Sequence, residues 1–346
     1  MANTLLTPSQ ITREALRVLH QKLNFIGAIN RQYDDSFAKD GAKIGSALRI
    51  RLPNQYTVRS GANLSAQDTT ENQVTLNVTS QKGVDTQFTS ADLTLSLDDF
   101  SQRIINPAMA VLAAAIEADA FSMALDVYNA VNNIGNVISF KNTLQARKIL
   151  NDNLAPMDGS RSIILNTQDN VDLVDALKGL FQDSSEIKAQ YRDGVMGHTA
   201  GFEFSENTLL PTQTTGTALS ATTYTVNGAN QTGSAVTVAT GSTTFKKGDI
   251  VTLAGCFRVH PETKTVLGDL QQFVVTADYA GGGGNLAISP AIVTSGGTQN
   301  VSASPTNGGA VTKVGGASAV YKPSLAFHKD AFTFATADLV LPKGVD

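Results

Sequence analysis

A long helix with almost no charged residues is the feature that most constrains how this chain can fold. We predict that it begins at Asn106, whose side chain can accept free amide hydrogens, followed by Pro107, whose missing N–H has no partner in a first turn. The helix is expected to run to about Asn133. At roughly 1.5 Å per residue it would span about 40 Å, so other elements must be built along it. The apolar residues that share one face of it are Met109, Leu112, Ile116, Ala120, Met123, Val127 and Ala130.

Length and charge narrow the class of protein. A chain of 346 residues exceeds one ordinary hydrophobic core and predicts two domains, or one domain with an insertion. Only 16% of the residues are charged, against about 25% in a typical soluble domain, so more of the surface than usual can face other protein. The net charge of −4 argues against nucleic-acid binding as the main function, although it allows neutral contact with DNA.

Residues with catalytic or metal-binding chemistry are few and scattered. The single cysteine, Cys256, excludes an internal disulfide, and the four histidines show no metal-ligand spacing. We therefore expect no enzyme and no catalytic, cofactor or metal site. No signal peptide is predicted, and no stretch is expected to approach the roughly 20 apolar residues of a membrane span.

Two short charged motifs are expected to be structural. Glu117 and Asp119 interrupt the long helix and should form salt bridges with, or cap, neighbouring elements, because residues two apart on a helix point in different directions. The string KKGD at 246–249 predicts an ordinary charged hairpin turn.

The N-terminal third predicts an arm and a ribbon. Residues 7–30 read as an amphipathic helix that Thr7 caps and Gly27 ends. Between residues 44 and 89, apolar residues alternate in two runs, around Ile50 and around Leu76, which predicts the two arms of a long hairpin. Its tip, about 56–72, is too polar for a core, and a two-stranded ribbon alone is marginally stable, so it must lie on something.

The remaining two thirds predict a mixed α+β region interrupted by a β-rich one. Helices are expected at 143–153 and 167–181, the second capped by Thr167, with a buried strand at 162–165. Residues 212–318 are rich in Thr, Ser, Gly, Ala and Val, and predict an inserted small β-barrel or sandwich with strands at 236–238, 250–253, 273–275 and 286–288. Phe327, Phe332 and Phe334 then alternate toward Leu339 and Leu341, as in a returning strand.

Candidate contacts between subunits lie on the arm and the ribbon. The apolar stripe of the arm must be buried, and arginine forms bidentate bonds to carboxylates across interfaces. The candidate residues are Ile11, Leu16, Leu19, Arg49, Arg51, Arg59, Asn63, Gln67 and Asp68.

This layout and several local strings resemble the major capsid (coat) proteins of tailed bacteriophages, in the short-tailed-phage subfamily whose coat carries an inserted I-domain. The strings are SLDDF at 96–100 followed by 104–121, YRDG at 191–194 with AGF at 200–202 and LP at 210–211, and KKGD at 246–249 with LAG at 253–255. In this order they cover nearly the whole chain.

The resemblance implies an α+β fold of the Hong-Kong-ninety-seven type, with a spine helix, an extended loop and an inserted all-β domain. The implied segments are an N-terminal arm at 1–31, a peripheral domain at 32–159 with extended loop 55–80 and spine helix 107–132, an axial domain with return strand at 160–211 and 319–346, and an I-domain at 212–318. The implied function is self-assembly of pentamers and hexamers into an icosahedral shell around double-stranded phage DNA.

The same resemblance implies partners and a location. Portal and scaffolding proteins are expected partners, packaged DNA is contacted without sequence specificity, and no membrane or cofactor is involved. The protein is expected in the virion capsid, and in the host cytoplasm during assembly. Two alternatives stay open on the residues alone: a trimeric phage fibre or adhesin, suggested by the Thr- and Gly-rich region, and a hydrolase with a β accessory domain.

Overall fold

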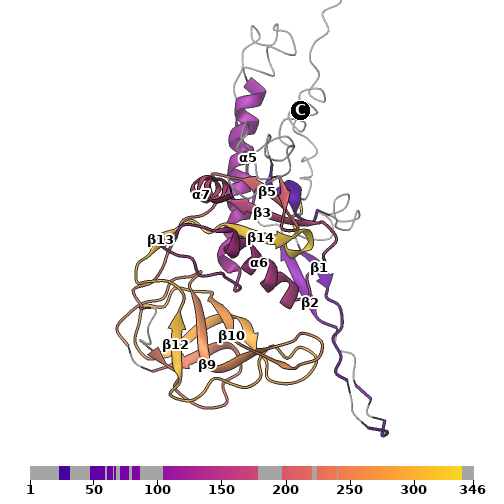
Figure 1. Ribbon diagram of the computed structural model, residues 1–346, viewed down its shortest axis with the longest axis vertical. Coiled ribbons are helices and arrows are strands. Elements are labelled where there is room, and N and C mark those ends of the chain that lie inside the picture. Colours follow the sequence, from indigo (N-terminus) through magenta and orange to yellow (C-terminus); the bar gives the residue numbers. More distant parts are fainter. Residues whose placement is uncertain are drawn as a thin grey trace, which may run out of the picture. The chain divides into compact units, whose positions relative to one another are not determined.

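Helices and strands both contribute to the fold of this computed structural model, as the sequence predicts (Figure 1). It describes residues 23–31, 47–58, 61–64, 66–67, 71–77, 80–85, 104–177, 197–219, 224–239 and 241–336. The chain divides into two compact units, which are described separately. The described residues of the first lie within Met1–Ile50, Gln73–Phe121 and Lys329–Asp346, and those of the second within Arg51–Asn72 and Ser122–His328.

The first unit is organised around the long apolar helix, which is shorter than predicted. Helix α5 spans Asn106–Phe121 and tightens into the 3₁₀ helix η3, Ser122–Asp126. Beyond Asp126 the expectation of a helix to Asn133 is wrong. This stretch is rich in asparagine and β-branched residues, which favour helices poorly, and the backbone of Ala130 bonds to a glutamine side chain instead of to a helix.

The start and the buried face of α5 also differ from the prediction. Residues 104–105 already form a π-helical turn continuous with α5, so Asn106 lies inside the helical stretch and is not its cap. The predicted stripe is only half-buried at Met109, Leu112 and Ile116. The fully buried residues of α5 are Ala113, Glu117, Ala120 and Phe121.

A short second helix, α2 (Phe25–Ala28), packs on α5 and continues through Gly27, which was predicted to end the N-terminal helix. Phe25 stacks on Phe121 with ring centroids 4.5 Å apart and meets Phe332 edge-on at 5.6 Å. The Glu117 carboxylate accepts the backbone N–H groups of Asn24 and Phe25 at the start of α2. Lys82 forms an ion pair with Asp119, 2.5 Å between Nζ and Oδ2. The prediction that these two carboxylates bond to neighbouring elements is confirmed.

The stretch Asn106–Asp126 is long and apolar enough, by length and composition, to cross a membrane. The expectation that no stretch would approach this length is therefore wrong. A single helix of this kind is weak evidence for a span, because helices that pack against protein meet the same criteria.

The predicted ribbon is present. Strands β1 (Ala47–Arg51) and β2 (Gln73–Asn77) form a two-stranded sheet, and Leu52 N donates to Asn72 O at 2.8 Å, which extends the pairing by one rung. The described residues of the loop that joins the strands are mostly exposed.

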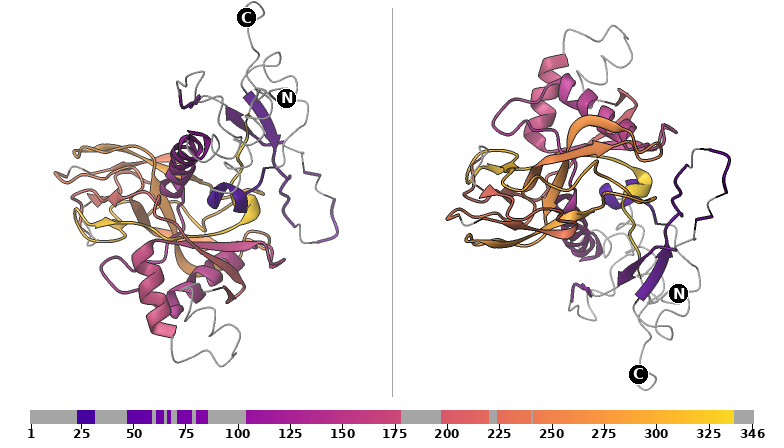
Figure 2. Two further views of the ribbon diagram at one scale, coloured as in Figure 1. Left: turned by 90° about the horizontal axis from the view of Figure 1, so that it is seen from above. Right: turned by 90° about the horizontal axis from the view of Figure 1, so that it is seen from below.

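A six-stranded sheet occupies most of the second unit, with the strand order β7-β12-β9-β10-β11-β8. Val226 bridges Val238, and Ala239 N donates to Thr225 O at 2.8 Å, so the two outer strands of this order meet and the sheet closes into a barrel. Figures 1 and 2 show its strands in orange to yellow. The strands are β7 (Tyr224–Thr225), β8 (Gly233–Val238), β9 (Ile250–Val259), β10 (Val266–Val275), β11 (Gly284–Ile292) and β12 (Ala310–Lys313). The four strand predictions made for this region are confirmed.

The barrel interior is filled by alternating apolar side chains. Val251 and Leu253 of β9, Phe273 of β10 and Leu286 of β11 are all fully buried. Each such burial contributes about 1.5–3 kcal/mol relative to exposure. The alternation of buried and less buried residues along β9 is interrupted at Gly255. Its φ is +89°, and a Cβ atom there would lie 2.4 Å from Thr306 Oγ1. Only glycine fits this bend.

A four-stranded sheet, in the order β14-β3-β5-β4, forms the other part of this unit. Strand β3 (Arg161–Leu165) runs parallel to β5 (Phe202–Glu206) and antiparallel to β14 (Leu325–His328), while β4 (His198–Thr199) pairs with β5. Because β3 is central, Ile163, Ile164 and Leu165 are all buried. The strand predicted at 162–165 is confirmed.

Helices α6 (Phe140–Asp152) and α7 (Thr167–Leu177) match the predicted helices, with corrected ends. Ser139 and Asn142 form a capping box that starts α6 three residues earlier than predicted. At α7 the cap is Asn166, whose Oδ1 accepts Asp169 N at 2.8 Å, and the predicted cap, Thr167, is the first helical residue. Residues 178–181 of the predicted helix lie outside the described residues.

Strands β6 (Gln213–Thr214) and β13 (Val320–Tyr321) pair where the chain enters and leaves the barrel region. Next to them lies buried Lys313, whose Nζ donates to Gly216 O at 2.7 Å and Gly316 O at 2.8 Å. Asp249 is also buried, and its Oδ2 accepts Gly216 N at 2.9 Å. Burial lowers the pKa of Lys313. The two crossing segments are therefore fastened to the barrel by buried polar groups.

The returning strand is shorter than predicted. Phe327 lies in β14, but the 3₁₀ helix η4 (Lys329–Ala331) interrupts the alternation before Phe332. Phe334 N donates to Asn30 O at 3.0 Å, so the segment follows the chain around Asn30 rather than extending β14. Leu339 and Leu341 lie outside the described residues.

Candidate functional site

The described residues contain no cluster suited to metal binding. Within these residues, no three His, Cys, Asp or Glu side chains gather as a metal site would require. Burial raises the pKa of the Cys256 thiol to about 12, so it stays protonated and is a poor nucleophile. His328 lies 3.2 Å from Asp158, an exposed carboxylate whose pKa is lowered, first by a backbone hydrogen bond from Ser160.

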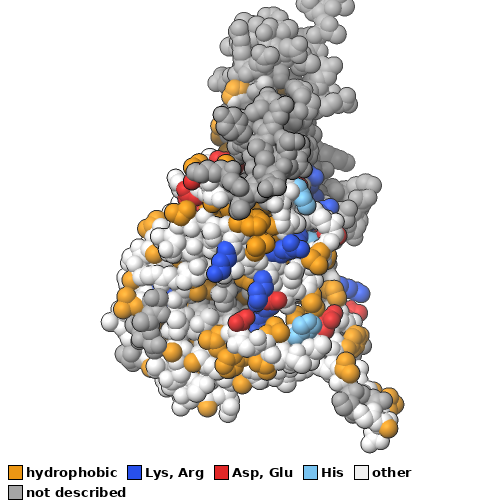
Figure 3. Space-filling model, viewed as in Figure 1, with side chains coloured by type: hydrophobic (Ala, Val, Ile, Leu, Met, Phe, Trp, Pro, Cys, Tyr) orange, Lys and Arg blue, Asp and Glu red, His pale blue; other side chains and the backbone are white. Residues whose placement is uncertain are grey.

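The tip of the ribbon is held by one side chain and exposes two others. Gln67 Oε1 accepts Thr57 N at 2.9 Å, and Gln67 Nε2 donates to Thr57 O at 2.5 Å, which closes the loop on itself. Val58 and Leu64 are 93% and 88% exposed. Hydrophobic side chains are visible along this tip in Figure 3. Burial of one such side chain by a partner would contribute about 1.5–3 kcal/mol.

The structure separates the predicted contact residues into two places. Arg49 and Arg51 lie exposed on β1, and Arg51 forms a loose ion pair with Glu71, 3.6 Å between Nη1 and Oε2. Asn63 and Gln67 lie exposed at the tip, and the side-chain amide of Gln67 is hydrogen-bonded to the backbone of Thr57. The other candidates, Ile11, Leu16, Leu19, Arg59 and Asp68, lie outside the described residues.

The KKGD segment is a turn that leads into β9, not a turn between paired strands. Lys246 forms an ion pair with Asp278 at 2.6 Å, and Lys247 with Asp126 of η3 at 2.9 Å. The hydrogen bond from Lys246 lowers the pKa of Asp278. Asp249 Oδ2 accepts Lys246 N and fixes the turn. The motif is therefore structural, as expected, although it is not a hairpin.

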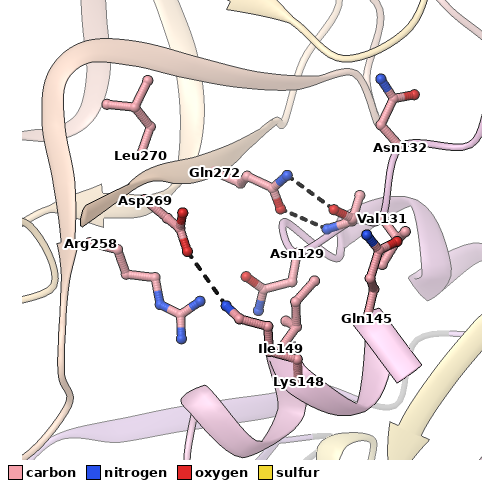
Figure 4. Close-up of a pocket in the computed structure, with 11 residues that line it drawn as sticks. Asn129, Val131, Asn132, Gln145, Lys148, Ile149, Arg258, Asp269, Leu270 and Gln272 are labelled. Carbon is pink, nitrogen blue, oxygen red and sulfur yellow. Dashed lines mark hydrogen bonds and ion pairs between the residues drawn. The ribbon is translucent and has the colours of Figure 1, made fainter. Parts of the chain in front are cut away.

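A polar cavity of about 440 Å³ lies where α6 and the segment 129–132 face β9 and β10 (Figure 4). Gln272 of β10 binds the backbone of Ala130 twice, accepting its N–H at 2.8 Å and donating to its carbonyl at 3.0 Å. Lys148 of α6 bonds to Asp152 at 2.8 Å and reaches Asp269 of β10 at 3.5 Å. Asp152 raises the pKa of Lys148. In Figure 3, Lys and Arg side chains gather with acidic ones over the part of the face where α6 and β10 lie.

Comparison with known proteins indicates the family of proteins to which the chain is similar. The profile of the P22 coat protein family, gene protein 5, matches residues 38–345. A solved structure described as Mycobacterium phage Che8 is also similar, with 16% sequence identity over 78% of this chain and 88% of that chain, at a TM-score of 0.43. A search of curated proteins gave no match.

The family match spans most of the chain and places it among phage coat proteins. The chain belongs to the P22 coat protein family, and it is a major capsid protein of a tailed phage. Its role is structural, within a multimeric shell, and its place is the virion capsid. The fibre and hydrolase alternatives gain no support.

Sequence reasoning missed the cavity and the exposed apolar tip. Val58 and Leu64 could have been noticed as isolated apolar residues in a polar stretch. Gln272 gives no such signal, because its partner, Ala130, is distant in sequence. Arg258 gives none, because the cavity that it lines is formed by segments far apart in the sequence.

Proposed function

We propose that this coat protein closes into an icosahedral shell of pentamers and hexamers around double-stranded DNA, and that the ribbon is one of its contacts between subunits. The exposure of Val58 and Leu64 carries the proposal for the ribbon. Exposed apolar side chains on a two-stranded ribbon are costly in an isolated subunit and become useful when a neighbour covers them. Many modest contacts of this kind then act together.

The chain organisation that fits this role is of the Hong-Kong-ninety-seven type. In our proposal α5 is the spine helix, residues 55–80 are the extended loop, and the four-stranded sheet belongs to the axial domain. The barrel, whose strands lie between β6 and β13 in the chain, is the inserted I-domain within 212–318. The closed strand order and the pairing of Thr214 with Val320 support an insertion that can fold as one piece.

The partners follow from the same role. We propose that a portal protein and a scaffolding protein act with the coat protein during assembly in the host cytoplasm. Packaged DNA would be touched without base recognition, which suits the absence of a basic excess in a chain with net charge −4.

Electron microscopy of the purified protein tests the proposal. Closed shells with pentamers and hexamers are expected, with or without co-expressed scaffolding protein. Elongated trimers would favour a fibre, and small uniform particles under every condition would contradict shell assembly. Variants of the ribbon tip, described in the Discussion, separate its contribution from that of the rest of the chain.

A further inference from the structure

The cavity between α6 and the barrel contains an arginine whose hydrogen bonds are incomplete. Arg258 of β9 reaches into the cavity, and its Nη2 atom is buried without a hydrogen-bond partner among the described residues. A buried donor left unpaired costs about 1–3 kcal/mol, so such groups usually meet a partner in the working protein.

Two other cations of this unit, Arg161 and Lys148, have acceptors for their donors. Arg161 donates to Pro156 O, Asn151 Oδ1 and Ala155 O at 2.5–2.9 Å. Lys148, which lines the same cavity, has the carboxylates of Asp152 and Asp269. In the part of the chain that the structure describes, the cavity therefore lacks a hydrogen-bond acceptor for the Arg258 guanidinium.

The surroundings of Arg258 define the chemistry of that acceptor. Figure 4 shows the Lys148 ammonium on the same side of the cavity as the guanidinium. The guanidinium fork matches two oxygens held in one plane, as in a carboxylate. The lining also holds the amide side chains of Asn129, Asn132 and Gln145, and an apolar part made of Val131, Ile149 and Leu270.

We propose that this cavity is a carboxylate-binding site, in which Arg258 receives the carboxylate and the apolar lining receives its aliphatic stem. Lys148 contributes a second positive charge that Asp269 and Asp152 partly offset, so recognition depends mainly on Arg258. Both carboxylates pair with Lys148, so Arg258 is the cation of the lining for which the described residues supply no ion-pair partner.

The carboxylate can come from two sources that share this chemistry: a small free dicarboxylate, or an acidic side chain of another copy in the shell. The first source is tested on unassembled full-length protein with sodium succinate, against sodium chloride at equal ionic strength. We expect a saturable rise in melting temperature with succinate, because a ligand of the native state stabilises it by mass action. Arg258→Gln should weaken the apparent affinity at least about tenfold, as the loss of a charged hydrogen bond predicts.

The controls separate the site from general charge effects. Lys246→Gln removes a lysine whose partner, Asp278, lies outside the lining of the cavity, and it should respond to succinate like the wild type. Arg258→Lys keeps the charge but loses the fork, and should bind succinate less tightly than the wild type. It also serves if Arg258→Gln fails to fold.

The second source rests on the proposed shell assembly and has its own readout. If succinate has no effect on the unassembled wild type, Arg258→Gln should melt normally yet form shells at a lower yield, while Lys246→Gln forms them normally. The site is contradicted if the Arg258 variants match the wild type both in their response to succinate and in shell yield. Failure of the wild type itself to form shells under any condition would instead contradict the proposed function.

Discussion

Glu117 and Phe25 are 92 residues apart in the sequence, yet the Glu117 carboxylate accepts the backbone N–H of Phe25 at 2.6 Å. The bond closes the start of α2 with a side chain from the middle of α5. Glu117 is only 2% exposed, and the Phe25 ring stacks on Phe121 one turn further along the same helix. Glu117, the buried charged residue of a mostly apolar helix, thus positions the aromatic contacts of the first unit.

Glu117→Ala should destabilise the first unit by about 2 kcal/mol, because buried backbone donors lose their acceptor. Glu117→Gln keeps an acceptor oxygen and should cost less. Thermal or denaturant unfolding of both variants measures the difference. Equal stability of Glu117→Ala and the wild type would show that water replaces the carboxylate without penalty.

Gln272→Leu should cost about 1–2 kcal/mol, because both polar groups of the Ala130 backbone lose their partner. Gln272→Glu should be worse, because a carboxylate cannot donate to the Ala130 carbonyl and repels it. Hydrogen exchange resolved at the Ala130 amide should speed up in both variants. An unchanged exchange rate there would mean that this amide is protected by something other than Gln272.

Lys313→Met should cost about 1–3 kcal/mol, because the Gly216 and Gly316 carbonyls each lose a charged donor. Each carbonyl keeps one neutral donor, Ser318 N for Gly216 and Thr215 Oγ1 for Gly316, which limits the loss. Lys322→Met, at an exposed lysine nearby in sequence, should stay within about 0.5 kcal/mol of the wild type. Chemical denaturation of the two variants compares them directly. Similar losses in both would contradict a special role for the buried amine.

Alkaline pH should weaken the second unit. Burial raises the pKa of Cys256 and of Tyr321 to about 12, from ordinary values of 9.0 and 10.0. Between those values the folded state keeps protons that the unfolded chain releases, so stability falls as pH rises from about 9 to 12. Tyr321→Phe should make this fall shallower in melting temperatures measured across the range. If the melting temperature of Tyr321→Phe falls with pH as steeply as that of the wild type, Tyr321 does not contribute to the alkaline loss of stability.

Val58→Asp combined with Leu64→Asp should abolish or strongly reduce shell formation while changing subunit stability by no more than about 0.5 kcal/mol, because both side chains are exposed in the subunit. Val58→Ala alone should have a smaller effect, since it keeps an apolar surface. Particle yield by electron microscopy and subunit melting are the two readouts. Normal shells from the double variant would leave the ribbon tip without a role in assembly.

Short-range sequence patterns correctly predicted the strands and helices that depend mainly on neighbouring residues. The four barrel strands follow alternation between glycine-rich turns, and the strand at 162–165 follows a buried apolar run. The helix near 143 follows apolar spacing, although its start depends on the Ser139 and Asn142 capping box. The sequence did not decide between a barrel and a sandwich. The bonds that join β7 to β8 and close the barrel depend on strand register, which composition does not reveal.

Errors occurred where tertiary contacts override propensity. The long helix was extended to Asn133 because apolar spacing continues, but Gln272 holds the Ala130 backbone in another conformation. The buried face of α5 was misplaced because Glu117, a charged residue, lies on it. Within the candidate site, exposed arginines were predictable from the ribbon, whereas the unpaired nitrogen of Arg258 depends on how β9, β10 and α6 meet.

The pairing of Thr214 with Val320 has a consequence for how such a gene can change. The chain departs and returns at adjacent points, so the DNA between these two codons can be lengthened, shortened or exchanged without displacing the sheet that contains β3. Variation between related phages should therefore concentrate in that stretch, and a foreign sequence grafted there would be displayed on every copy.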